Sequence, residues 1–438
     1  MHKPLLLRGA RQVGKSTAVR HLGERFEIYL EINFEKQPIY RTLFDNDLDV
    51  RRIVPLMAAM SEKEITPGRT LLFLDEIQSC PKAIMALRFF KEDMPELHVI
   101  AAGSLLEFAL DELPTFGVGR IRSLFMYPMT FDEFLMANGA MMLMNRRDKA
   151  SSSNPLETIF HEKLIEYLRI FILVGGMPES VKKWVETHDF LQCQQILDDI
   201  LSGYEDDFPK YRKVVNPQLL RTTLGSVATQ SGNKFVYAQV PGEYKATEVK
   251  KALEMLIKAG LIIPVTHSDS NGLPLGGSCN TKIRKMLLMD TGLMLRIESL
   301  NTGDASGIAT HILTSRAAEL VNKGSIAEML FGLEYLHYAA KNLRMELFYW
   351  VRQTKNSLAE IDYVIPCGGK AIPVEVKAGV QGGMKSLWEF MREKKSTQAI
   401  RCSLENYGKM EYVDEKAEGI VRNINICPLY AVSSIIQK

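Results

Sequence analysis

Residues 9–16 read Gly-Ala-Arg-Gln-Val-Gly-Lys-Ser. This run matches the Gly-x-x-x-x-Gly-Lys-Ser/Thr pattern of a phosphate-binding loop, the P-loop. It lies between the apolar run Leu5–Leu7, a predicted strand, and residues 17–22, which have helical character. Glycines let the backbone wrap closely around a phosphate, and successive N–H groups at a helix N-terminus then bind the anion. Strand, loop and helix in this order predict a site for nucleotide phosphates.

The residue types of this loop predict its ligands. Lys15 supplies a point charge to the β- and γ-phosphates, and the Ser16 hydroxyl is an oxygen ligand of the kind that Mg²⁺ prefers. The alternative interpretation is a glycine-rich turn. We expect ATP and Mg²⁺ as cofactors, with the nucleotide bound by Gly9, Ala10, Arg11, Gln12, Val13, Gly14, Lys15, Ser16, Thr17 and Asp75.

A second apolar run, Leu71–Leu74, ends in two consecutive carboxylates, Asp75 and Glu76. This is the form of a Walker B strand. A carboxylate at the carboxyl end of such a strand can hold Mg²⁺ together with Ser16, and the next carboxylate is placed to orient or deprotonate the attacking water. We therefore expect Glu76 to be catalytic, although an ordinary acidic strand end is the alternative.

Two further residues occupy positions where such ATPases place sensors. Ser104 follows the apolar run His98–Ala102, so its hydroxyl could contact the γ-phosphate or the attacking water. Arg120 precedes the next predicted strand and could supply positive charge to the transition state, in cis or from a neighbouring subunit. Arg122 is the competing candidate for this role.

Strand-like and helix-like segments alternate through the first 150 residues. This alternation predicts a parallel sheet covered on both faces. The small and polar run Ala150–Pro155 is the best linker candidate, and the pattern then becomes helical to about residue 211. The predicted strands of the first part are residues 5–7, 29–34, 71–74, 98–102 and 124–127.

A series of motifs resembles a family of bacterial and archaeal AAA-type (AAA+) ATPases. The motifs are GARQVGKST at 9–17, FLDEIQSCP at 73–81, AAGSLLEFAL at 101–110, PMTFDEFL at 128–135 and GGMPESV at 175–181. The resemblance extends over nearly the whole chain. It implies ATP hydrolysis, and it implies a C-terminal domain similar to the PD-(D/E)XK nuclease fold.

The middle of the chain resembles a winged helix, with three short helices in residues 218–265 and a hairpin over Pro264–Met289. Positive charge on this module could contact DNA phosphates. The alternative is the solvated face of a protein-interaction or lid module. The charged residues on the last helix are Lys250, Lys251, Glu254 and Lys258, and those on the hairpin are Lys282, Arg284 and Lys285.

A second hairpin is predicted near the C-terminus, where Gly368-Gly369 separates Ile361–Ile365 from Ile372–Val376. With the glycines at the turn centre, Asp362 lies opposite Glu375. The other face is uniformly apolar and is expected to be core, with Ile361, Tyr363 and Ile365 opposite Val376, Val374 and Ile372. Opposed carboxylates about 5 Å apart repel each other unless a cation lies between them.

Asp362 followed by Glu375-Val376-Lys377 has the form of the PD-(D/E)XK signature. We expect Asp362 and Glu375 to share a second divalent cation, Mg²⁺ or Mn²⁺, while Lys377 stabilises developing charge or positions water. In related folds the position of Glu328 can supply another carboxylate. The alternative is a degenerate domain that keeps the fold without the chemistry.

The composition of the chain restricts the kinds of partner and the cellular compartment that these sites could have. Lys and Arg total 54 and Asp and Glu total 52 in 438 residues, so the net charge of +2 restricts any nucleic-acid surface to a local patch. No apolar run reaches the roughly 18 residues needed to span a bilayer. The six cysteines lie far apart without metal-ligand or disulfide spacing. We expect a cytoplasmic protein without a membrane segment.

The predicted fold class is α/β, with four parts. They are an AAA-type P-loop domain with a parallel sheet (1–150), a helical lid or linker (151–215), a winged helix (216–305) and an α/β restriction-endonuclease-like domain (306–438). The predicted function is an ATP-dependent, Mg²⁺-dependent molecular switch acting on DNA or on a protein partner, in a chain that could form a homo-oligomer. Alternatives are an ATP-gated metal-dependent DNA nuclease, or a nucleotide-dependent scaffold with little turnover.

Overall fold

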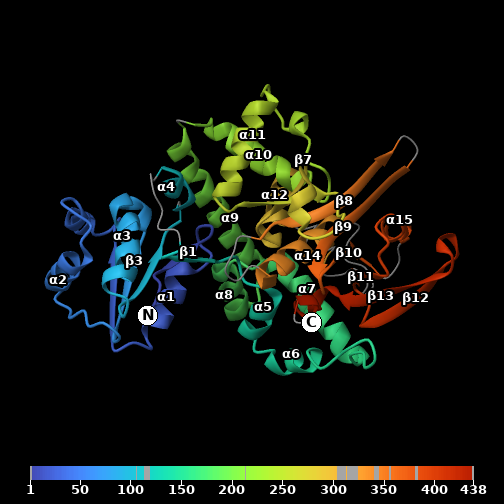
Figure 1. Ribbon diagram of the computed structural model, residues 1–438, viewed down its shortest axis with the longest axis horizontal. Coiled ribbons are helices and arrows are strands. Elements are labelled where there is room, and N and C mark those ends of the chain that lie inside the picture. The colour runs from blue at the N-terminus through green and yellow to red at the C-terminus, as the bar shows by residue number, and fades with distance from the viewer. Residues whose placement is uncertain are drawn as a thin grey trace. The chain divides into compact units, whose positions relative to one another are not determined.

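The computed structural model forms two compact units, one up to Tyr127 and the other from Pro128 onward in the main (Figure 1). The structure describes residues 2–104, 106–112, 119–212, 214–302, 312, 324–339, 345–354, 357–379 and 383–436. Within these ranges, no helix combines the length and the apolar character needed to cross a bilayer.

The first unit contains a five-stranded sheet in the order β2-β3-β4-β1-β5, with all neighbours parallel. All five predicted strands are present, so the predicted parallel sheet is confirmed. The strands are β1 (Leu5–Arg8), β2 (Ile28–Asn33), β3 (Thr70–Asp75), β4 (His98–Ala102) and β5 (Arg122–Phe125).

Helices cover both faces of this sheet. Alternate residues of a strand point to opposite faces, and β3 shows this clearly. Leu71 and Phe73 pack with Val19 of the first helix, whereas Leu72 and Leu74 belong to a separate core cluster with the helices that follow β2 and β3. The helical elements are α1 (Lys15–Gly23), η1 (Pro38–Phe44), α2 (Val50–Ser61), η2 (Ile77–Ser79), α3 (Pro81–Asp93) and α4 (Leu106–Glu112).

The second unit begins with a run of helices, and further helices alternate with its strands. Thr130 and Glu133 form a reciprocal capping box at the start of α5, which satisfies two backbone donors of its first turn. The helices are α5 (Phe131–Ala137), α6 (Met141–Arg147), α7 (Thr158–Val174), α8 (Pro178–Thr187), α9 (Phe190–Asp207), η3 (Phe208–Tyr211), α10 (Pro217–Thr229), η4 (Tyr237–Gln239), α11 (Ala246–Lys258), η5 (Leu275–Ser278), α12 (Thr291–Thr302), α14 (Gly324–Ala339), α15 (Lys385–Glu393), η6 (Glu415–Ala417), η7 (Leu429–Ala431) and α16 (Ser433–Ile436).

The second unit also contains an eight-stranded mixed sheet, in the order β12-β13-β11-β10-β9-β8-β6-β7. The predicted wing is the hairpin β6–β7, and β6 pairs in parallel with β8. The boundary predicted near residue 305 therefore crosses one continuous sheet. The strands are β6 (Ile262–Ser268), β7 (Cys279–Leu288), β8 (Leu347–Thr354), β9 (Ser357–Cys367), β10 (Lys370–Val376), β11 (Gln398–Ser403), β12 (Gly408–Asp414) and β13 (Ile420–Pro428).

The predicted register of the β9–β10 hairpin is confirmed, since Val374 lies opposite Tyr363. The prediction that Ile361 and Tyr363 share one apolar face is wrong. Ile361 belongs to a core cluster with Phe390 of α15, whereas the ring of Tyr363 lies 5.0 Å from that of Phe331 in α14. The cause is an irregularity in the β8–β9 pairing, where an extra residue of β9 interrupts the alternation.

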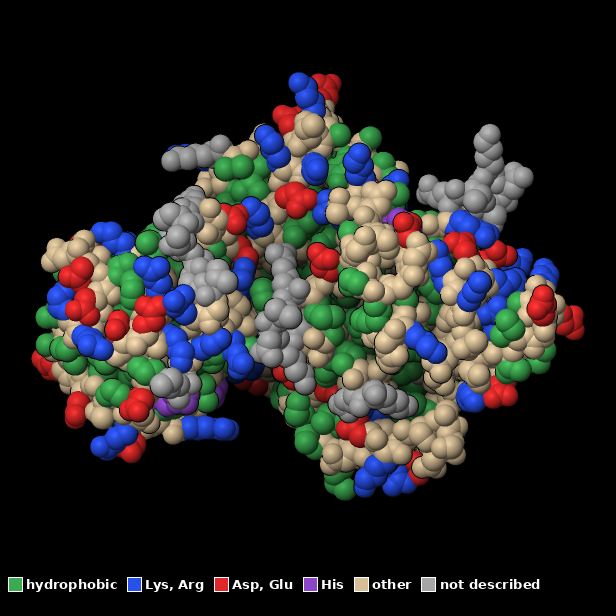
Figure 2. All heavy atoms as spheres, in the orientation of Figure 1, with side chains coloured by type: hydrophobic (Ala, Val, Ile, Leu, Met, Phe, Trp, Pro, Cys, Tyr) green, Lys and Arg blue, Asp and Glu red, His purple; other side chains and the backbone are tan. Residues whose placement is uncertain are grey.

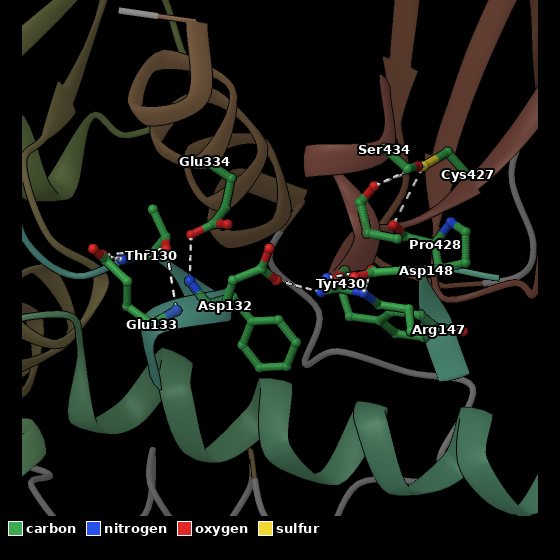
Figure 3. Close-up of polar contacts among 12 residues, drawn as sticks. Thr130, Asp132, Glu133, Arg147, Asp148, Glu334, Cys427, Pro428, Tyr430 and Ser434 are labelled. Atoms are coloured by element: carbon green, nitrogen blue, oxygen red, sulfur yellow. Dashed lines mark hydrogen bonds and ion pairs between the residues drawn. The ribbon is translucent and has the colours of Figure 1, made fainter. Parts of the chain in front are cut away.

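A buried arginine connects the start of the second unit to its last segment (Figure 3). Arg147, at the end of α6, is 2% exposed. Its guanidinium contacts the Asp132 carboxylate, donates to Asp148 Oδ1 at 2.7 Å and donates to the Tyr430 carbonyl at 3.1 Å. A planar guanidinium with several fixed donors suits such a three-way contact. The contact holds two segments together that lie 283 residues apart in sequence.

Glu334 of α14 lies beside this contact (Figure 3). Among the described residues, its carboxylate forms no ion pair. Its carboxylate accepts a hydrogen bond from the Phe131 N–H at 2.9 Å, and the residue is 4% exposed. Burial, reinforced by Asp132 and Glu133, raises the pKa of Glu334 to about 8, against the lowering effect of Arg147. The buried carboxyl group is therefore protonated at neutral pH.

We expect Glu334→Gln to change how stability depends on pH. The folded wild-type protein keeps a proton on Glu334 up to about pH 8, whereas the unfolded chain releases it near the ordinary value of 4.5. Wild-type stability is therefore lost progressively as pH rises through this interval. The free energy of unfolding of Glu334→Gln, measured relative to that of wild type, should therefore be at least about 1 kcal/mol higher at pH 8 than at pH 5.

Urea unfolding at both pH values measures this change. Glu162→Gln, at an exposed position of α7, is the matched control and should show no such gain. Identical pH profiles for wild type and Glu334→Gln would contradict the buried, protonated carboxyl group.

Candidate functional site

The predicted phosphate-binding loop joins β1 to α1 in the first unit. Gly9 has a φ of 140°, and a Cβ there would lie 2.1 Å from the Met126 carbonyl oxygen. Gly14 adopts the left-handed conformation directly before α1. Any side chain at position 9 would collide with the backbone, and the left-handed backbone conformation at position 14 favours glycine. The loop thus presents its backbone at the N-terminus of a helix, as anion binding requires.

Lys15 is buried in this loop, with 8% of its surface exposed. Its Nζ donates to the carbonyl oxygens of Gly9 at 2.9 Å and Ala10 at 2.6 Å. Burial lowers the pKa of the Lys15 ammonium to about 8, partly offset by Glu76 and Asp75. The ammonium therefore lies on the inner side of the loop, in reach of a phosphate held by the same backbone.

The Walker B carboxylate lies next to the loop. Ser16 Oγ donates to Asp75 Oδ1 at 3.0 Å, so the two predicted Mg²⁺ ligands are adjacent. Asn33 Nδ2 donates to Asp75 Oδ2 at 3.1 Å from the neighbouring strand β2. Burial raises the pKa of Asp75, and these two hydrogen bonds oppose the increase. Asn33 was missed by the sequence analysis, although its place at the end of a predicted strand was a usable signal.

Glu76 and Ser104 also come together at this edge of the sheet. Ser104 Oγ donates to Glu76 Oε2 at 3.4 Å, and Gln78 Nε2 donates to the same oxygen at 2.5 Å. Glu76 has a φ of 48°, which turns the chain sharply after β3. Gln78 was also missed by the sequence analysis, although its position two residues after Glu76 was a usable signal. Its amide fixes the carboxylate orientation of Glu76.

The two arginine candidates lie elsewhere in the first unit. Arg120 forms an ion pair with Glu92 of α3 and is half exposed. Arg122 begins β5 opposite Leu5, at the amino end of the parallel strands. The loop and the carboxylates follow the carboxyl ends of these strands, at the opposite edge. Within one chain, neither arginine is therefore brought to Glu76, and a role from a neighbouring subunit stays a prediction.

One further arginine is closer to the loop than either candidate. Arg8 immediately precedes Gly9 and forms a two-pronged ion pair with Glu107 of α4. Its guanidinium also lies 4.8 Å from the centre of the Phe125 ring. Arg8 was missed by the sequence analysis, because an arginine at a strand end has many structural uses. Its contacts fix the segment that enters the loop.

A separate cluster of charged side chains lies within the second unit. At its centre is Lys285 of β7, 2% exposed. Its Nζ lies 3.0 Å from Glu328 Oε2 and 2.5 Å from Glu360 Oε1. The expectation that Lys285 presents its charge to DNA from the wing is therefore wrong, because the strand turns this side chain inward. Arg284 pairs with Glu254 at 2.8 Å.

The predicted nuclease-like residues belong to the same cluster. Asp362 Oδ2 accepts the Val376 N–H at 2.7 Å, and Lys377 Nζ donates to Glu375 Oε1 at 2.5 Å. The other oxygen of Glu375, Oε2, is buried and has no hydrogen-bond partner among the described residues. The charge of Asp362 raises the pKa of Glu328 and that of Glu375, after the larger effect of burial. The structure thus brings together all four predicted residues.

Burial and mutual repulsion perturb this cluster strongly. Burial, followed by Asp362, raises the pKa of Glu328 to about 8 and that of Glu375 to about 7. Burial also raises the pKa of Asp362, although Lys285 opposes it. Across the described part of the chain, no group of three or more His, Cys, Asp or Glu residues is arranged to hold a metal ion. The structure therefore does not support the predicted second cation.

Comparison with known proteins gives matches for separate segments. Residues 1–135 match the family model described as an AAA domain. Residues 165–304 and 323–429 match two families described as domains of unknown function, DUF8612 and DUF4143. A solved structure similar to this chain is the Walker-type ATPase PABY2304 of Pyrococcus abyssi. It shares 15% sequence identity at a TM-score of 0.42, over 68% of this chain and 91% of that chain. No curated protein matches the chain.

The AAA-domain match and the geometry of the loop agree. The five-stranded parallel sheet fits a P-loop NTPase fold, and the matched region contains both the loop and the Walker B strand. At the level of the family, these findings support an ATP-binding ATPase. The predicted winged-helix and nuclease-like parts match only families without a described function.

Proposed function

We propose that this chain binds ATP with Mg²⁺ and hydrolyses it as a molecular switch. The observation that supports this proposal is the convergence of four side chains at one edge of the sheet. Ser16 lies 3.0 Å from Asp75, and Ser104 lies 3.4 Å from Glu76. Phosphate release from ATP, measured with the purified protein with and without Mg²⁺, tests the proposal.

The oxygen donors at this edge fit the metal that ATP hydrolysis usually needs. A hydroxyl from Ser16 and a carboxylate from Asp75 are hard ligands of the type Mg²⁺ binds. Bound Mg²⁺ supplies neutralisation of charge on the β- and γ-phosphates. Asn33 orients the Asp75 carboxylate by its hydrogen bond. Lys15 adds a second positive charge when its ammonium turns from the loop carbonyls to the phosphates.

Hydrolysis itself is assigned to Glu76. A carboxylate at this position can orient a water molecule and accept its proton as the γ-phosphate is attacked. Gln78 and Ser104 hold one Glu76 oxygen by hydrogen bonds, which limits the directions in which the carboxylate can face. Ser104 is also placed to sense the γ-phosphate. Hydrolysis then depends mainly on how the Glu76 carboxylate and the attacking water are positioned.

As part of the same proposal, the switch acts on DNA, and the exposed face of α11 supports this. Lys250 and Lys251 are exposed on this helix while Val249, Leu253 and Leu256 are buried. Figure 2 shows Lys and Arg side chains among those exposed over α10 and α11. Phosphate contacts from such a face give affinity without sequence preference. Action on a protein partner, a cytoplasmic setting and homo-oligomer formation belong to the same proposal.

Charge reversal on this face should weaken DNA binding. We expect the triple variant Lys250→Glu, Lys251→Glu and Lys282→Glu to lose at least about tenfold in affinity for every duplex sequence at low salt, with a shallower salt dependence. Fluorescence anisotropy at several salt concentrations measures this. The control reverses three exposed lysines of the first unit, Lys36, Lys63 and Lys82. Equal losses in both triple variants would contradict a site on α11.

The alternative function is a metal-dependent DNA nuclease that uses Glu328, Asp362, Glu375 and Lys377, with a divalent cation shared by Asp362 and Glu375. The convergence of these side chains favours it, and the lysine at the centre of the cluster weighs against it. Cleavage of supercoiled DNA in Mg²⁺ or Mn²⁺ distinguishes this function from the ATPase switch. A scaffold with little turnover would bind ATP without releasing phosphate.

A further inference from the structure

The charged cluster of the second unit contains its own cation. Lys285 approaches it from the β6–β7 hairpin, while Glu328 comes from α14 and Glu360 from β9. The Lys285 side chain is 3% exposed, so its two ion pairs replace nearly all of its contact with water. Charges buried in this way must be paired to be tolerated. The pairing here is within the chain.

Several elements fix the position of this ammonium. Lys285 lies opposite Val265 in the β6–β7 ladder, so its backbone is held in the sheet. Its Nζ lies 5.3 Å from the centre of the Tyr349 ring, close enough for a cation–π contact. The Tyr363 hydroxyl donates to the Glu328 carbonyl at 2.8 Å, which ties α14 to β9. The β6–β7 ladder, the Tyr349 ring and the contact between α14 and β9 therefore together fix the position of the lysine in the cluster.

The charges in the cluster do not balance. Four carboxylates, on Glu328, Glu360, Asp362 and Glu375, face two ammonium groups, on Lys285 and Lys377. If every carboxyl group were ionised, an excess of two negative charges would remain; the raised pKa values of Glu328 and Glu375, about 8 and about 7, allow bound protons to relieve this excess. Within the cluster, Glu375 Oε2 is buried and has no hydrogen-bond partner among the described residues. The cluster without Lys285 would carry a still larger excess.

We propose that Lys285 is the resident cation of this cluster and takes the place of a divalent metal ion. While the lysine is in place, the cluster binds neither Mg²⁺ nor Mn²⁺ at Asp362 and Glu375. The double ion pair of a fully buried lysine, placed among the carboxylates of the cluster, carries the inference. The inference does not depend on ATP hydrolysis.

The role of Lys285 has a consequence for the architecture of the chain. The lysine belongs to the segment predicted as a winged helix, and the carboxylates belong to the segment predicted as nuclease-like. The cluster is therefore composite, and the hairpin is part of it. A substitution of Lys285 should act on metal binding, whereas a role limited to packing would affect stability alone.

Metal binding by the full-length protein tests this inference. Manganese binding is measured without nucleotide, by electron paramagnetic resonance and by the thermal shift that Mn²⁺ produces. We expect wild type and Asp362→Asn to respond alike, because the cluster takes no metal in either. We expect Lys285→Met to gain a site at least about tenfold tighter than any in wild type, with a clear thermal shift. Adding Asp362→Asn to Lys285→Met should abolish this gain.

Controls separate the outcomes. Lys285→Arg keeps the positive charge and should behave as wild type toward Mn²⁺. Manganese binding by wild type that Asp362→Asn removes would overturn the inference, and so would equal responses of wild type and a folded Lys285→Met. If Lys285→Met does not fold, Lys285→Gln replaces it in the comparison, and manganese binding by wild type that Asp362→Asn removes still overturns the inference. Failure of the ATPase proposal would instead appear in phosphate release and leave these measurements unchanged.

Discussion

Glu76→Gln should lower the rate constant of ATP hydrolysis by on the order of 10² to 10⁴ while nucleotide binding stays close to that of wild type. The substitution keeps the shape of the side chain and its acceptor oxygen for Ser104 and Gln78. It removes the negative charge that would orient the attacking water and accept its proton. Steady-state phosphate release, alongside equilibrium titration with a fluorescent ATP analogue, measures both quantities.

Lys15→Ala should separate binding from chemistry at the same site. Its buried ammonium lies within the loop, where it donates to the carbonyls of Gly9 and Ala10, and its removal takes a positive charge away from the predicted position of the β- and γ-phosphates. We therefore expect weaker nucleotide binding, in contrast to Glu76→Gln. Glu35→Gln, at an exposed position after β2, is the control and should leave both quantities unchanged. Wild-type turnover in Glu76→Gln would refute the assignment of Glu76.

Arg147→Met should destabilise the second unit strongly. The substitution keeps a long apolar stem and removes a guanidinium that is 2% exposed, leaving the Asp132 carboxylate and the Tyr430 carbonyl without their donor. Removing one partner of a buried ion pair costs about 3–5 kcal/mol. For domains of this size, the transition of the second unit should fall by roughly 6–20 °C.

The neighbouring arginine provides a matched control for this effect. Arg146 is about half exposed and pairs with the equally exposed Glu157. Exposed ion pairs contribute about 0–1 kcal/mol, so Arg146→Met should shift the same transition by only a few degrees. Differential scanning calorimetry of the three proteins makes the comparison. Equal shifts for the two variants would contradict the contact between α6 and the C-terminal segment.

The strands and the loop of the first unit could be predicted because their signals are local. A P-loop needs particular residue types at fixed spacing, and a buried parallel strand is a continuous apolar run. Leu71–Leu74 is such a run, since it is fully buried in β3 and leads directly to Asp75. The contact between Ser16 and Asp75 followed from the two motifs together.

The sequence was less informative where the outcome depended on which strand lay beside which. The two glycines of the β9–β10 turn gave the correct register, but one irregularity in the pairing with β8 placed Ile361 and Tyr363 against different helices. Asn33 reached Asp75 only because β2 neighbours β3. A local pattern does not contain the identity of a neighbouring strand.

By itself, the sequence determined the loop, the Walker B carboxylates and the apolar strands that position them, because each depends on residues adjacent in the chain. Only the tertiary structure decided the surroundings of Lys285 and Arg147. Lys285 is 43 residues from Glu328, and Arg147 is 283 residues from Tyr430. A lysine on a strand is compatible with a DNA contact or with a buried ion pair. The difference lies in the free energy of burying its charge, and only the folded chain supplies the carboxylates that make this burial favourable.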